Sequence, residues 1–217
     1  MDKFIKDCNY HINFESKDNS HFNGVAFLDR DGVVIKEKVY IKDPKDVELN
    51  PGINRLIKYL NSLNYKIIII TNQSGINRGY FDWEDYFRVT KRMLDLLDDE
   101  IKINSLYACG SHNMKICNWR KPGTGMIYQG WTKELILEKD SILIGDKSTD
   151  IEAGINANLR NLFHVLTGHG EEEKEKVINL IRDSDYNFEK TRFQEKGFFQ
   201  SKNLDFLYKQ ILSLNNY

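Results

Sequence analysis

The sequence predicts an α/β domain built on a doubly wound, mostly parallel sheet, and two observations support this fold class. From residue 25 to about residue 165, short apolar runs alternate with segments whose apolar residues recur at helical spacing. Most of the apolar runs lack an in-and-out alternation, which is typical of strands covered by helices on both faces. Alternation of such strands with helices favours parallel pairing through helical crossovers.

The first predicted strand is Val25–Leu28, and a helix follows it. The helix is indicated by apolar residues at helical spacing, namely Ile53, Leu56, Ile57, Leu60 and Leu63. Asn50 suits the capping position before this helix, and Pro51 suits its first turn. Lys66–Thr71 is then a run rich in β-branched residues without alternation, which predicts a second buried strand.

The middle of the chain continues this order. Asp82 caps a predicted helix that extends to about Asp99, and a weaker strand follows at Ser105–Ala108. The core candidates of that helix are Trp83, Phe87, Met93, Leu94 and Leu97. A further helix is predicted at roughly residues 125–138.

Two more strands and three helices complete the predicted elements. Ser141–Ile144 is a buried strand, a helix spans about residues 148–157, and Leu162–Val165 is the last strand. Beyond it, residues 171–176 begin a charged helix. A short terminal helix is indicated by an apolar stripe, which comprises Leu204, Leu207, Ile211 and Leu212.

Composition and charge narrow the class of protein. The 217 residues fit one α/β domain with extensions. With 31 basic and 32 acidic residues the net charge is −1, which gives no electrostatic argument for binding nucleic acid or an anionic membrane. No run approaches a membrane-spanning length, the start lacks the apolar segment of a signal peptide, and three cysteines make no disulfide framework. We therefore expect a cytoplasmic protein without a membrane partner.

Polar groups follow the predicted strands at their carboxyl ends. Asp29 and Asp31 come directly after the first strand. Residues 71–74 (Thr-Asn-Gln-Ser) end the second, residues 120–121 (Arg-Lys) lie in the loop after the third, and residues 145–150 (Gly-Asp-Lys-Ser-Thr-Asp) follow the fourth. Each stretch alone is a common turn, cap or solvated loop. Together they predict a site, because ligands of doubly wound sheets bind outside the carboxyl ends of the strands.

These residue types fit phosphoryl transfer. Asp29 is a carboxylate that can attack phosphorus and form an aspartyl-phosphate. Asp31 can protonate the leaving oxygen and then activate water. Asp29 and Asp146 can bind Mg²⁺, which removes the repulsion between carboxylate and phosphate. Thr71 and Lys121 can hold the phosphoryl oxygens where charge develops.

The motifs resemble those of the haloacid dehalogenase-type phosphatases. Asp29-Arg-Asp31-Gly resembles the first motif, Thr71 the second, Lys121 the third, and Gly145-Asp146-x-x-x-Asp150 the fourth. Longer stretches resemble a branch that contains D-glycero-D-manno-heptose bisphosphate phosphatases and histidinol-phosphate phosphatases. These stretches are FLDRDGVV, ELNPGINRLIKYLN, TNQSGINRGYF, RKPGTGM and IGDKSTDIEAGINAN. The resemblance implies a Rossmann-like haloacid dehalogenase fold without a large cap domain.

The resemblance also implies a role for each matched residue. Asp29 would be the nucleophile and Asp31 the acid and base, while Thr71 and Lys121 would grip the phosphoryl group. The implied Mg²⁺ ligands are Asp29, the backbone carbonyl of Asp31, and Asp146, with Asp150 orienting the lysine motif or the metal shell. The candidate substrate contacts are Asn72, Ser74, Arg78 and Arg120.

One loop departs from the family pattern. The family has Cys-x-His followed by Cys-x-Cys, a set that holds a structural zinc. This chain has Cys109, His112 and Cys117, with Ser111 in the place of the ligand histidine and Trp119 in the place of the last cysteine. Structural zinc is bound by four protein ligands. With at most three side chains left, we expect no structural zinc.

The resemblance implies a Mg²⁺-dependent phosphomonoesterase acting on a small phosphorylated sugar, as a monomer or homodimer. Residues 75–79 (Gly-Ile-Asn-Arg-Gly) resemble the heptose branch more than the histidinol branch. This favours a heptose 1,7-bisphosphate that loses its 7-phosphate to give heptose 1-phosphate, in the synthesis of surface polysaccharides. Three alternatives stay open: histidinol phosphate as substrate, the 3′-phosphate of nucleic acid ends as substrate, and a non-catalytic role in binding a phosphosugar or a partner.

The resemblance covers residues 24–168, which form the predicted phosphatase domain. Residues 1–23 are then an N-terminal extension and residues 169–217 a helical C-terminal extension, and we expect both to pack against the core. Alternatively, Phe193–Phe199, whose aromatic residues look exposed, forms a dimer contact or shields the site.

Overall fold

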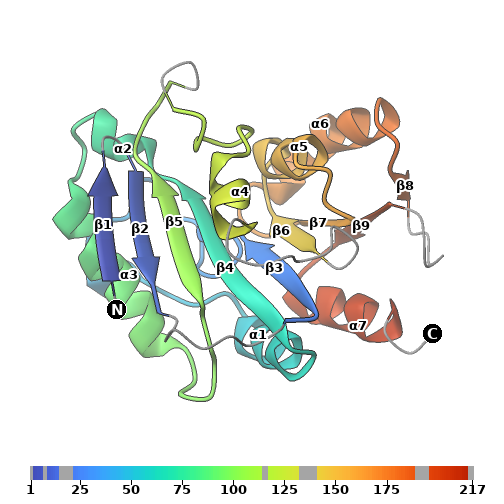
Figure 1. Ribbon diagram of the computed structural model, residues 1–217, viewed down its shortest axis with the longest axis horizontal. Helices are drawn as coiled ribbons and strands as arrows, with labels where there is room; N and C mark the ends of the chain where they lie inside the picture. Colours follow the sequence, from blue (N-terminus) through green and yellow to red (C-terminus); the bar gives the residue numbers. More distant parts are fainter. Residues whose placement is uncertain are drawn as a thin grey trace.

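A computed structural model describes residues 2–6, 9–14, 22–113, 117–131, 141–188 and 196–214, the first of these ranges by its backbone alone. The described residues form a nine-stranded sheet (Figure 1). Its strands, in spatial order, are β1 (Asp2–Lys6), β2 (Asn9–Asn13), β5 (Ser105–Cys109), β4 (Tyr65–Asn72), β3 (Gly24–Leu28), β6 (Ile142–Gly145), β7 (Asn161–Val165), β9 (Gly197–Ser201) and β8 (Asn187–Phe188). Every pair from β5 to β8 is parallel, whereas β1 and β2 join one edge antiparallel.

Helices cover both faces of the sheet, as Figure 1 shows, so the predicted doubly wound α/β fold is confirmed. One apolar cluster joins the sheet to α1 (Ile53–Ser62), α3 (Trp83–Leu96) and α7 (Leu204–Leu214). The other joins it to α4 (Gly125–Trp131), α5 (Ser148–Asn156) and α6 (Gly170–Arg182). A 3-10 turn (Pro44–Asp46) and the short helix α2 (Ser74–Asn77) lie in the connections.

Two-sided burial explains why the strand sequences lack alternation. In β3, Ala26 and Leu28 face the cluster of α1, α3 and α7. Val25 and Phe27 face the opposite cluster, and all four side chains have no exposed surface. Because both faces lie under helices, both sets of alternating positions must be apolar.

The start of α1 differs from the prediction that Asn50 caps it. The residue before the helix is Gly52, with a φ of 89° that favours glycine, and no side chain caps the helix. The buried Asn50 amide instead donates to the carbonyl oxygens of Val33 and Ile35, at 3.0 Å each. Asn50 therefore holds in place the loop that follows Asp31. The Ile35 carbonyl also accepts from the Gly32 N–H at 2.8 Å, so Asn50 reinforces a turn that the backbone already closes.

Replacement of Asn50 by alanine is expected to lower the free energy of unfolding by about 1–3 kcal/mol, because the Val33 carbonyl oxygen loses its donor. The Ile35 carbonyl loses one of two donors and keeps the Gly32 N–H. Urea unfolding followed by circular dichroism measures the change. Asn179→Ala on α6 is the control: Asn179 is exposed, and we expect a change within about 0.5 kcal/mol. Equal, small changes in both variants would contradict the role given to Asn50.

Helix α3 begins where the sequence predicts and ends three residues early. Asp82 accepts from the backbone N–H of Asp85, whose side chain accepts from the Asp82 N–H, so the predicted cap is confirmed. The helix ends at Leu96, not near Asp99. Of the predicted core residues, Met93 and Leu97 are buried, while Trp83, Phe87 and Leu94 are partly buried. Tyr86 and Val89 are also fully buried, although the sequence analysis did not single them out.

The segments outside residues 24–168 add strands as well as helices. β2 pairs with β5, so residues 9–13 extend the sheet. After β7, helices α6 and α7 agree with the predicted helices, but β8 and β9 were not predicted. Phe198 and Phe199 in β9 are buried against opposite faces of the sheet, so the expectation that they are exposed was wrong. Phe193 lies outside the described residues.

The remaining predicted elements are found with small changes in length. Helix α4 is described as far as Trp131, and residues 132–138 of the predicted helix lie outside the described residues. Within the described ranges, no helix combines the length and the apolar character needed to cross a membrane.

Candidate active site

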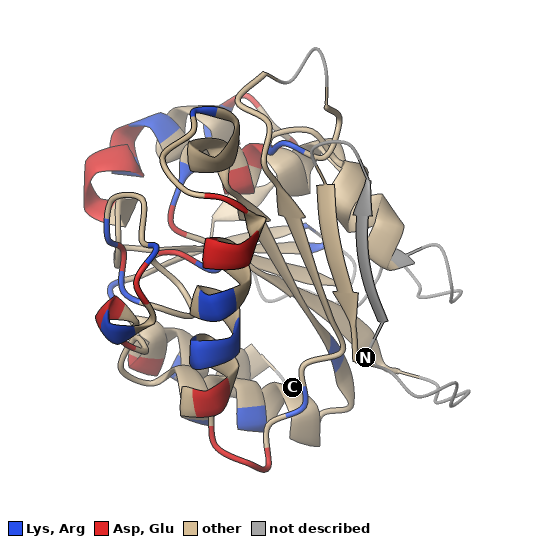
Figure 2. Cartoon of the chain, turned by 90° about the vertical axis from the view of Figure 1, so that its left-hand side faces the viewer, with Lys and Arg blue, Asp and Glu red and all other residues tan. Residues whose placement is uncertain are grey.

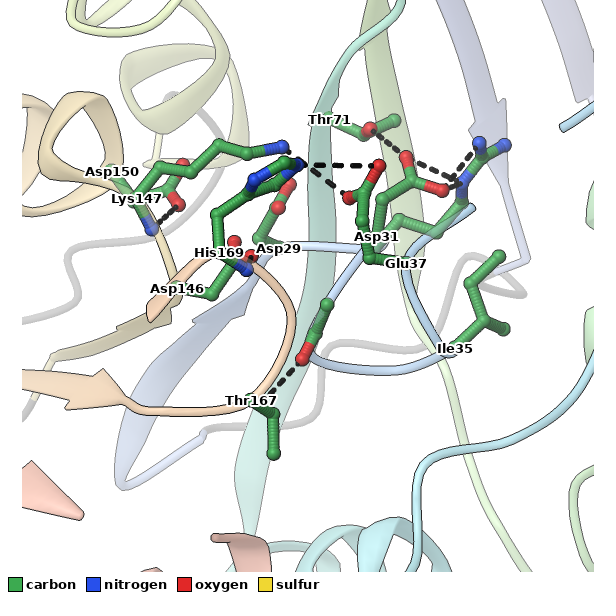
Figure 3. Close-up of polar contacts among 12 residues, drawn as sticks. Asp29, Asp31, Ile35, Glu37, Thr71, Asp146, Lys147, Asp150, Thr167 and His169 are labelled. Carbon is green, nitrogen blue, oxygen red and sulfur yellow. Dashed lines mark hydrogen bonds and ion pairs between the residues drawn. The ribbon is translucent and has the colours of Figure 1, made fainter. Parts of the chain in front are cut away.

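Three carboxylates converge at the carboxyl ends of β3 and β6 (Figure 3). Asp29 follows β3 directly, Asp146 follows β6 directly, and Asp150 lies in the first turn of α5. One carboxylate oxygen from each residue lies within 4.8 Å of those of the other two. All three side chains are buried. Three mutually repelling, buried groups at this spacing form a site suited to a hard cation.

Lys121 lies between two of these carboxylates. Its Nζ is 2.6 Å from Asp29 Oδ1, 2.6 Å from Asp150 Oδ1, and donates to the carbonyl oxygen of Ile70 at 3.0 Å. The Asn72 side chain holds the lysine backbone: its Nδ2 donates to the Lys121 carbonyl at 3.0 Å, and its Oδ1 accepts from the Lys121 N–H at 2.9 Å. The structure thus places Asn72, a predicted substrate contact, as the support of the lysine at the end of β4.

Burial and charge repulsion shift the pKa values of the carboxylates. Burial raises the pKa of Asp29 to about 7, against the opposing effect of Lys121, and the nearby Asp150 raises it further. Burial, with the charges of Asp29 and Asp150, raises the pKa of Asp146 to about 9. Asp146 Oδ1 is buried without a hydrogen-bond donor, whereas Oδ2 accepts from the His169 N–H at 2.8 Å. An unpartnered oxygen beside two more carboxylates fits a divalent cation, which would hold all three groups ionised.

Asp31 points away from the three carboxylates. Arg30 binds it through Nη2 at 2.8 Å and Nε at 3.1 Å, and Gln73 Nε2 donates to Asp31 Oδ2 at 2.8 Å. Thr71 Oγ1 donates to the same oxygen at 3.3 Å. Burial alone would raise the pKa of Asp31, but Arg30 and Gln73 outweigh it and hold that pKa below its usual value. The lowered pKa favours an ionised Asp31, two residues after Asp29 in the same loop.

Arg30 and Gln73 belong to the site, although neither was predicted to be a site residue. Arg30 is fully buried, and its guanidinium lies 5.1 Å from the centre of the Tyr86 ring. Their positions in the sequence could have indicated this, because both lie within the motifs. Arg30 stands between the two aspartates, and Gln73 comes two residues after Thr71. Arg30 contacts its neighbour in sequence, whereas the contact of Gln73 with Asp31 depends on β3 and β4 pairing side by side.

A cavity of about 270 Å³ opens beside Asp31. Residues 37–41 and residues 72–75 line two of its sides, with Lys147 and His169 at a third. Lys147 Nζ lies 3.3 Å from Glu37 Oε2, and His169 Nε2 lies 3.6 Å from Glu37 Oε1, as Figure 3 shows. Burial would lower the pKa of Lys147, but Asp29, Asp146 and Glu37 outweigh it and raise that pKa. The cavity thus combines cations with an acceptor, as a phosphorylated polyol requires.

The other predicted substrate contacts are dispersed. Ser74, at the start of α2, lines the cavity. Arg120 Nη1 donates to the Ser111 carbonyl at 3.0 Å, so this guanidinium supports the preceding loop. Arg78 is exposed at the end of α2 and is not among the residues that line the cavity.

The loop that departs from the family pattern brings two thiols together. Cys109 Sγ lies 3.1 Å from Cys117 Sγ, and Cys117 Sγ donates to Asn9 Oδ1 at 3.0 Å. The two sulfurs are not joined in a disulfide. His112 is exposed and its Nδ1 contacts the Asn77 side chain. The imidazole therefore has a partner on α2 instead of a thiol.

The geometry defines a phosphatase of the haloacid dehalogenase type. A buried aspartate stands beside a lysine, two further carboxylates suit a metal, and a second aspartate on the same loop can move a proton. The family model described as polynucleotide kinase 3 phosphatase matches residues 24–194. The chain belongs to this family of phosphatases.

The chain is similar to individual phosphatases in sequence and in fold. Over 141 residues the chain is 39% identical to a D-glycero-beta-D-manno-heptose-1,7-bisphosphate 7-phosphatase from Helicobacter pylori, covering 64% of this chain and 82% of that protein. Over 171 residues it is 39% identical to a D-glycero-alpha-D-manno-heptose-1,7-bisphosphate 7-phosphatase from Campylobacter jejuni, covering 73% and 96%. It shares the fold of the D,D-heptose 1,7-bisphosphate phosphatase from B. bronchiseptica, crystallised with magnesium and phosphate: the TM-score is 0.70 at 21% identity, covering 88% of this chain and 99% of that one.

Proposed function

We propose that this protein is a Mg²⁺-dependent phosphomonoesterase that removes the 7-phosphate of a heptose 1,7-bisphosphate and leaves heptose 1-phosphate. The observation that carries the proposal is the contact of Lys121 with both Asp29 and Asp150, inside a cluster of three buried carboxylates. Relatives at 39% identity that act on this class of substrate support the choice of sugar.

The metal would be held by Asp29, Asp146 and the backbone carbonyl of Asp31, with Asp150 supporting Lys121. When bound, Mg²⁺ supplies positive charge that offsets the repulsion between the carboxylates and the phosphoryl oxygens. Lys121 and Thr71 would hold the other phosphoryl oxygens. Lys121 is already placed for this by Asn72 and by the end of β4.

Asp29 attacks phosphorus, and the bond from phosphorus to the leaving oxygen breaks. Asp31 enters as a carboxylate, because Arg30 and Gln73 lower its pKa. It takes the proton of a singly protonated phosphoryl group and passes it to the leaving oxygen, so that the sugar departs as an alcohol. In the second half, Asp31 takes a proton from water while the water oxygen attacks phosphorus, and the bond from phosphorus to Asp29 breaks. Asp31 then gives the proton to the released phosphate, so both aspartates are carboxylates again.

A second candidate function is removal of 3′-phosphate from nucleic acid ends, which the description of the family model favours. The charge distribution speaks against it. The net charge is −1. On the side of the molecule that faces the viewer in Figure 2, basic residues are interspersed with acidic ones. Binding to a nucleic acid backbone draws on clustered positive charge. We therefore rank the small sugar bisphosphate first.

A phosphate-release assay with Mg²⁺ tests these alternatives. The panel comprises both anomers of heptose 1,7-bisphosphate, histidinol phosphate and a 3′-phosphorylated oligonucleotide. We expect a kcat/KM at least about tenfold higher for one heptose anomer than for the other compounds. Phosphorus NMR should show that the anomeric phosphate remains on the product. A preference for histidinol phosphate or for the oligonucleotide would replace the proposed substrate, and no release from any compound would support a non-catalytic binding role.

The two relatives act on opposite anomers at the same identity, 39%, so their names do not select one for this chain. The cavity beside Asp31 must make that choice. Its wall at residues 37–41 combines the charged Glu37 and Lys38 with the exposed, apolar Val39, so it offers the sugar both polar and apolar contacts. The assay with both anomers measures which of the two this chain prefers.

We also propose that the loop at residues 109–117 holds no structural zinc. The contact of His112 with Asn77, and the replacement of two family ligands by Ser111 and Trp119, support this. Metal analysis of the purified protein should find less than about one zinc per ten chains, because structural zinc needs four ligands. One tightly bound zinc per chain would contradict the proposal.

We also propose that this enzyme is cytoplasmic and that it is a monomer or a homodimer. The three cysteines of the sequence, which make no disulfide framework, support the choice of compartment. Sedimentation velocity of the full chain would measure the assembly, and a larger oligomer would contradict this expectation.

A further inference from the structure

A buried histidine outside the motifs contacts a residue of the site. His164 lies on β7, directly beside Gly145 of β6 in the strand register, and its side chain has no exposed surface. Its Nε2 lies 3.1 Å from the carbonyl oxygen of Asp146. Its Nδ1 lies 3.2 Å from the side-chain Nε2 of Gln200 on β9. Both ring nitrogens therefore have partners, one in the site and one in the C-terminal part of the sheet.

The partners determine the tautomer of this imidazole. The amide nitrogen of Gln200 can only donate, so His164 Nδ1 accepts with its lone pair. The carbonyl oxygen of Asp146 can only accept, so Nε2 carries the proton and donates it. Burial lowers the pKa of His164, which agrees with a neutral ring. Hydrogen bonds thus run from Gln200 to His164 and from His164 to Asp146.

The carboxylate of Asp146 is held on one side by its surroundings, so its direction also depends on how the Asp146 peptide is oriented. Its Oδ2 accepts from the His169 N–H at 2.8 Å. A Cβ at Gly32 or at Gly168 would lie 2.2 or 2.3 Å from this same oxygen, so backbone encloses it on two sides. The other oxygen, Oδ1, is buried without a hydrogen-bond partner, and Asp146 belongs to the cluster that also contains Asp29. The remaining fixed point of Asp146 is its carbonyl, which His164 holds.

We propose that Gln200 and His164 are positioning residues, which fix the peptide of Asp146 so that its carboxylate is presented to the metal. This inference rests on the proposed function, since it assigns Asp146 to a divalent cation. It also gives β9, which lies beyond the family match at residues 24–194, a role in the site. Partners that orient metal ligands in this way are worth about 10–100-fold in metal affinity.

Calorimetric titration of the metal-free protein with Mg²⁺ tests the role of His164. His164→Leu removes the donor and should weaken Mg²⁺ binding by about 10–100-fold, while kcat at saturating Mg²⁺ changes much less. His164→Gln keeps a donor near the position of Nε2 and should recover most of the affinity. Gln200→Leu, which acts through His164, should weaken binding by about tenfold or less. Val165→Ala, an equally buried change on β7, should lower the melting temperature without changing the Mg²⁺ affinity.

Two results would overturn the proposal. One is a Mg²⁺ affinity of His164→Leu within about twofold of the parent, with only the melting temperature lowered, because that marks a purely structural role. The other is nitrogen-15 NMR of the metal-free parent protein that finds the proton of His164 on Nδ1. The NMR measurement needs neither metal nor turnover. It therefore tests the two hydrogen bonds of His164 independently of metal binding. A parent protein that does not bind Mg²⁺ would count against the proposed function instead.

Discussion

Asp29→Asn is expected to lower phosphate release by at least about 10⁴-fold, because the variant loses the atom that attacks phosphorus. The amide has the shape of the carboxylate but no negative charge and little nucleophilicity. Asp29 stands next to Lys121 and to two further carboxylates, so the change should leave the fold intact and lessen the repulsion there. Initial rates of phosphate release with saturating Mg²⁺ measure the effect.

The matched control is Asp95→Asn, an identical change at an exposed position on α3. Its turnover should equal that of the parent protein within a factor of about two, as expected for a surface substitution. Near-parental turnover of Asp29→Asn would mean that another group attacks phosphorus. Equal losses in the two variants would mean that the assay reports folding or expression instead of chemistry.

The metal-free protein is expected to lose stability as the pH rises from about 5 to 9, and Mg²⁺ is expected to restore it. Burial raises the pKa of Asp29 to about 7 and that of Asp146 to about 9, from 3.8 for both when unfolded. Between these values the folded chain binds more protons than the unfolded chain. The stabilisation from these protons is complete below the unfolded pKa and is lost as the pH passes each folded pKa.

Thermal melts in chelator and in excess Mg²⁺, at intervals from pH 5 to 9, measure this effect. The stabilisation by Mg²⁺ should increase with pH, because the ligands must lose their protons to bind it. Chelation should also abolish turnover reversibly. In Asp146→Asn, which lacks one carboxylate, the melting temperature of the metal-free protein should fall less with pH than in the parent. The same slope in both proteins would show that other groups cause the pH dependence.

Much of the site could be predicted because its residues follow the strands directly. Asp29 and Asp146 come straight after β3 and β6, and parallel neighbours present their carboxyl ends at one edge. Lys121 is different, since it reaches the cluster through a long loop. Its proposed role came from the resemblance to known motifs. The structure shows what holds it in place, which is a pair of hydrogen bonds between its backbone and the side chain of Asn72, 49 residues away in sequence.

Other residues could not be assigned from sequence because their partners are distant. Asn50 reads as a helix cap, yet its amide holds the loop at Val33 and Ile35. His164 and Gln200 belong to no motif, and their hydrogen bonds arise only because β7 lies between β6 and β9. A polar side chain has several possible partners, and the choice depends on which strands become neighbours.

The sequence by itself determined the periodicity of the elements, hence the α/β class, and the chemical groups that end the strands. These properties are local, because strand and helix patterns depend on neighbouring residues. The tertiary structure alone decided the order of the nine described strands, the separation of Asp31 from the three carboxylates, and the raised pKa values of Asp29 and Asp146. The physical reason is that desolvation and hydrogen bonding are set by atoms from distant parts of the chain, which the packed core brings into contact.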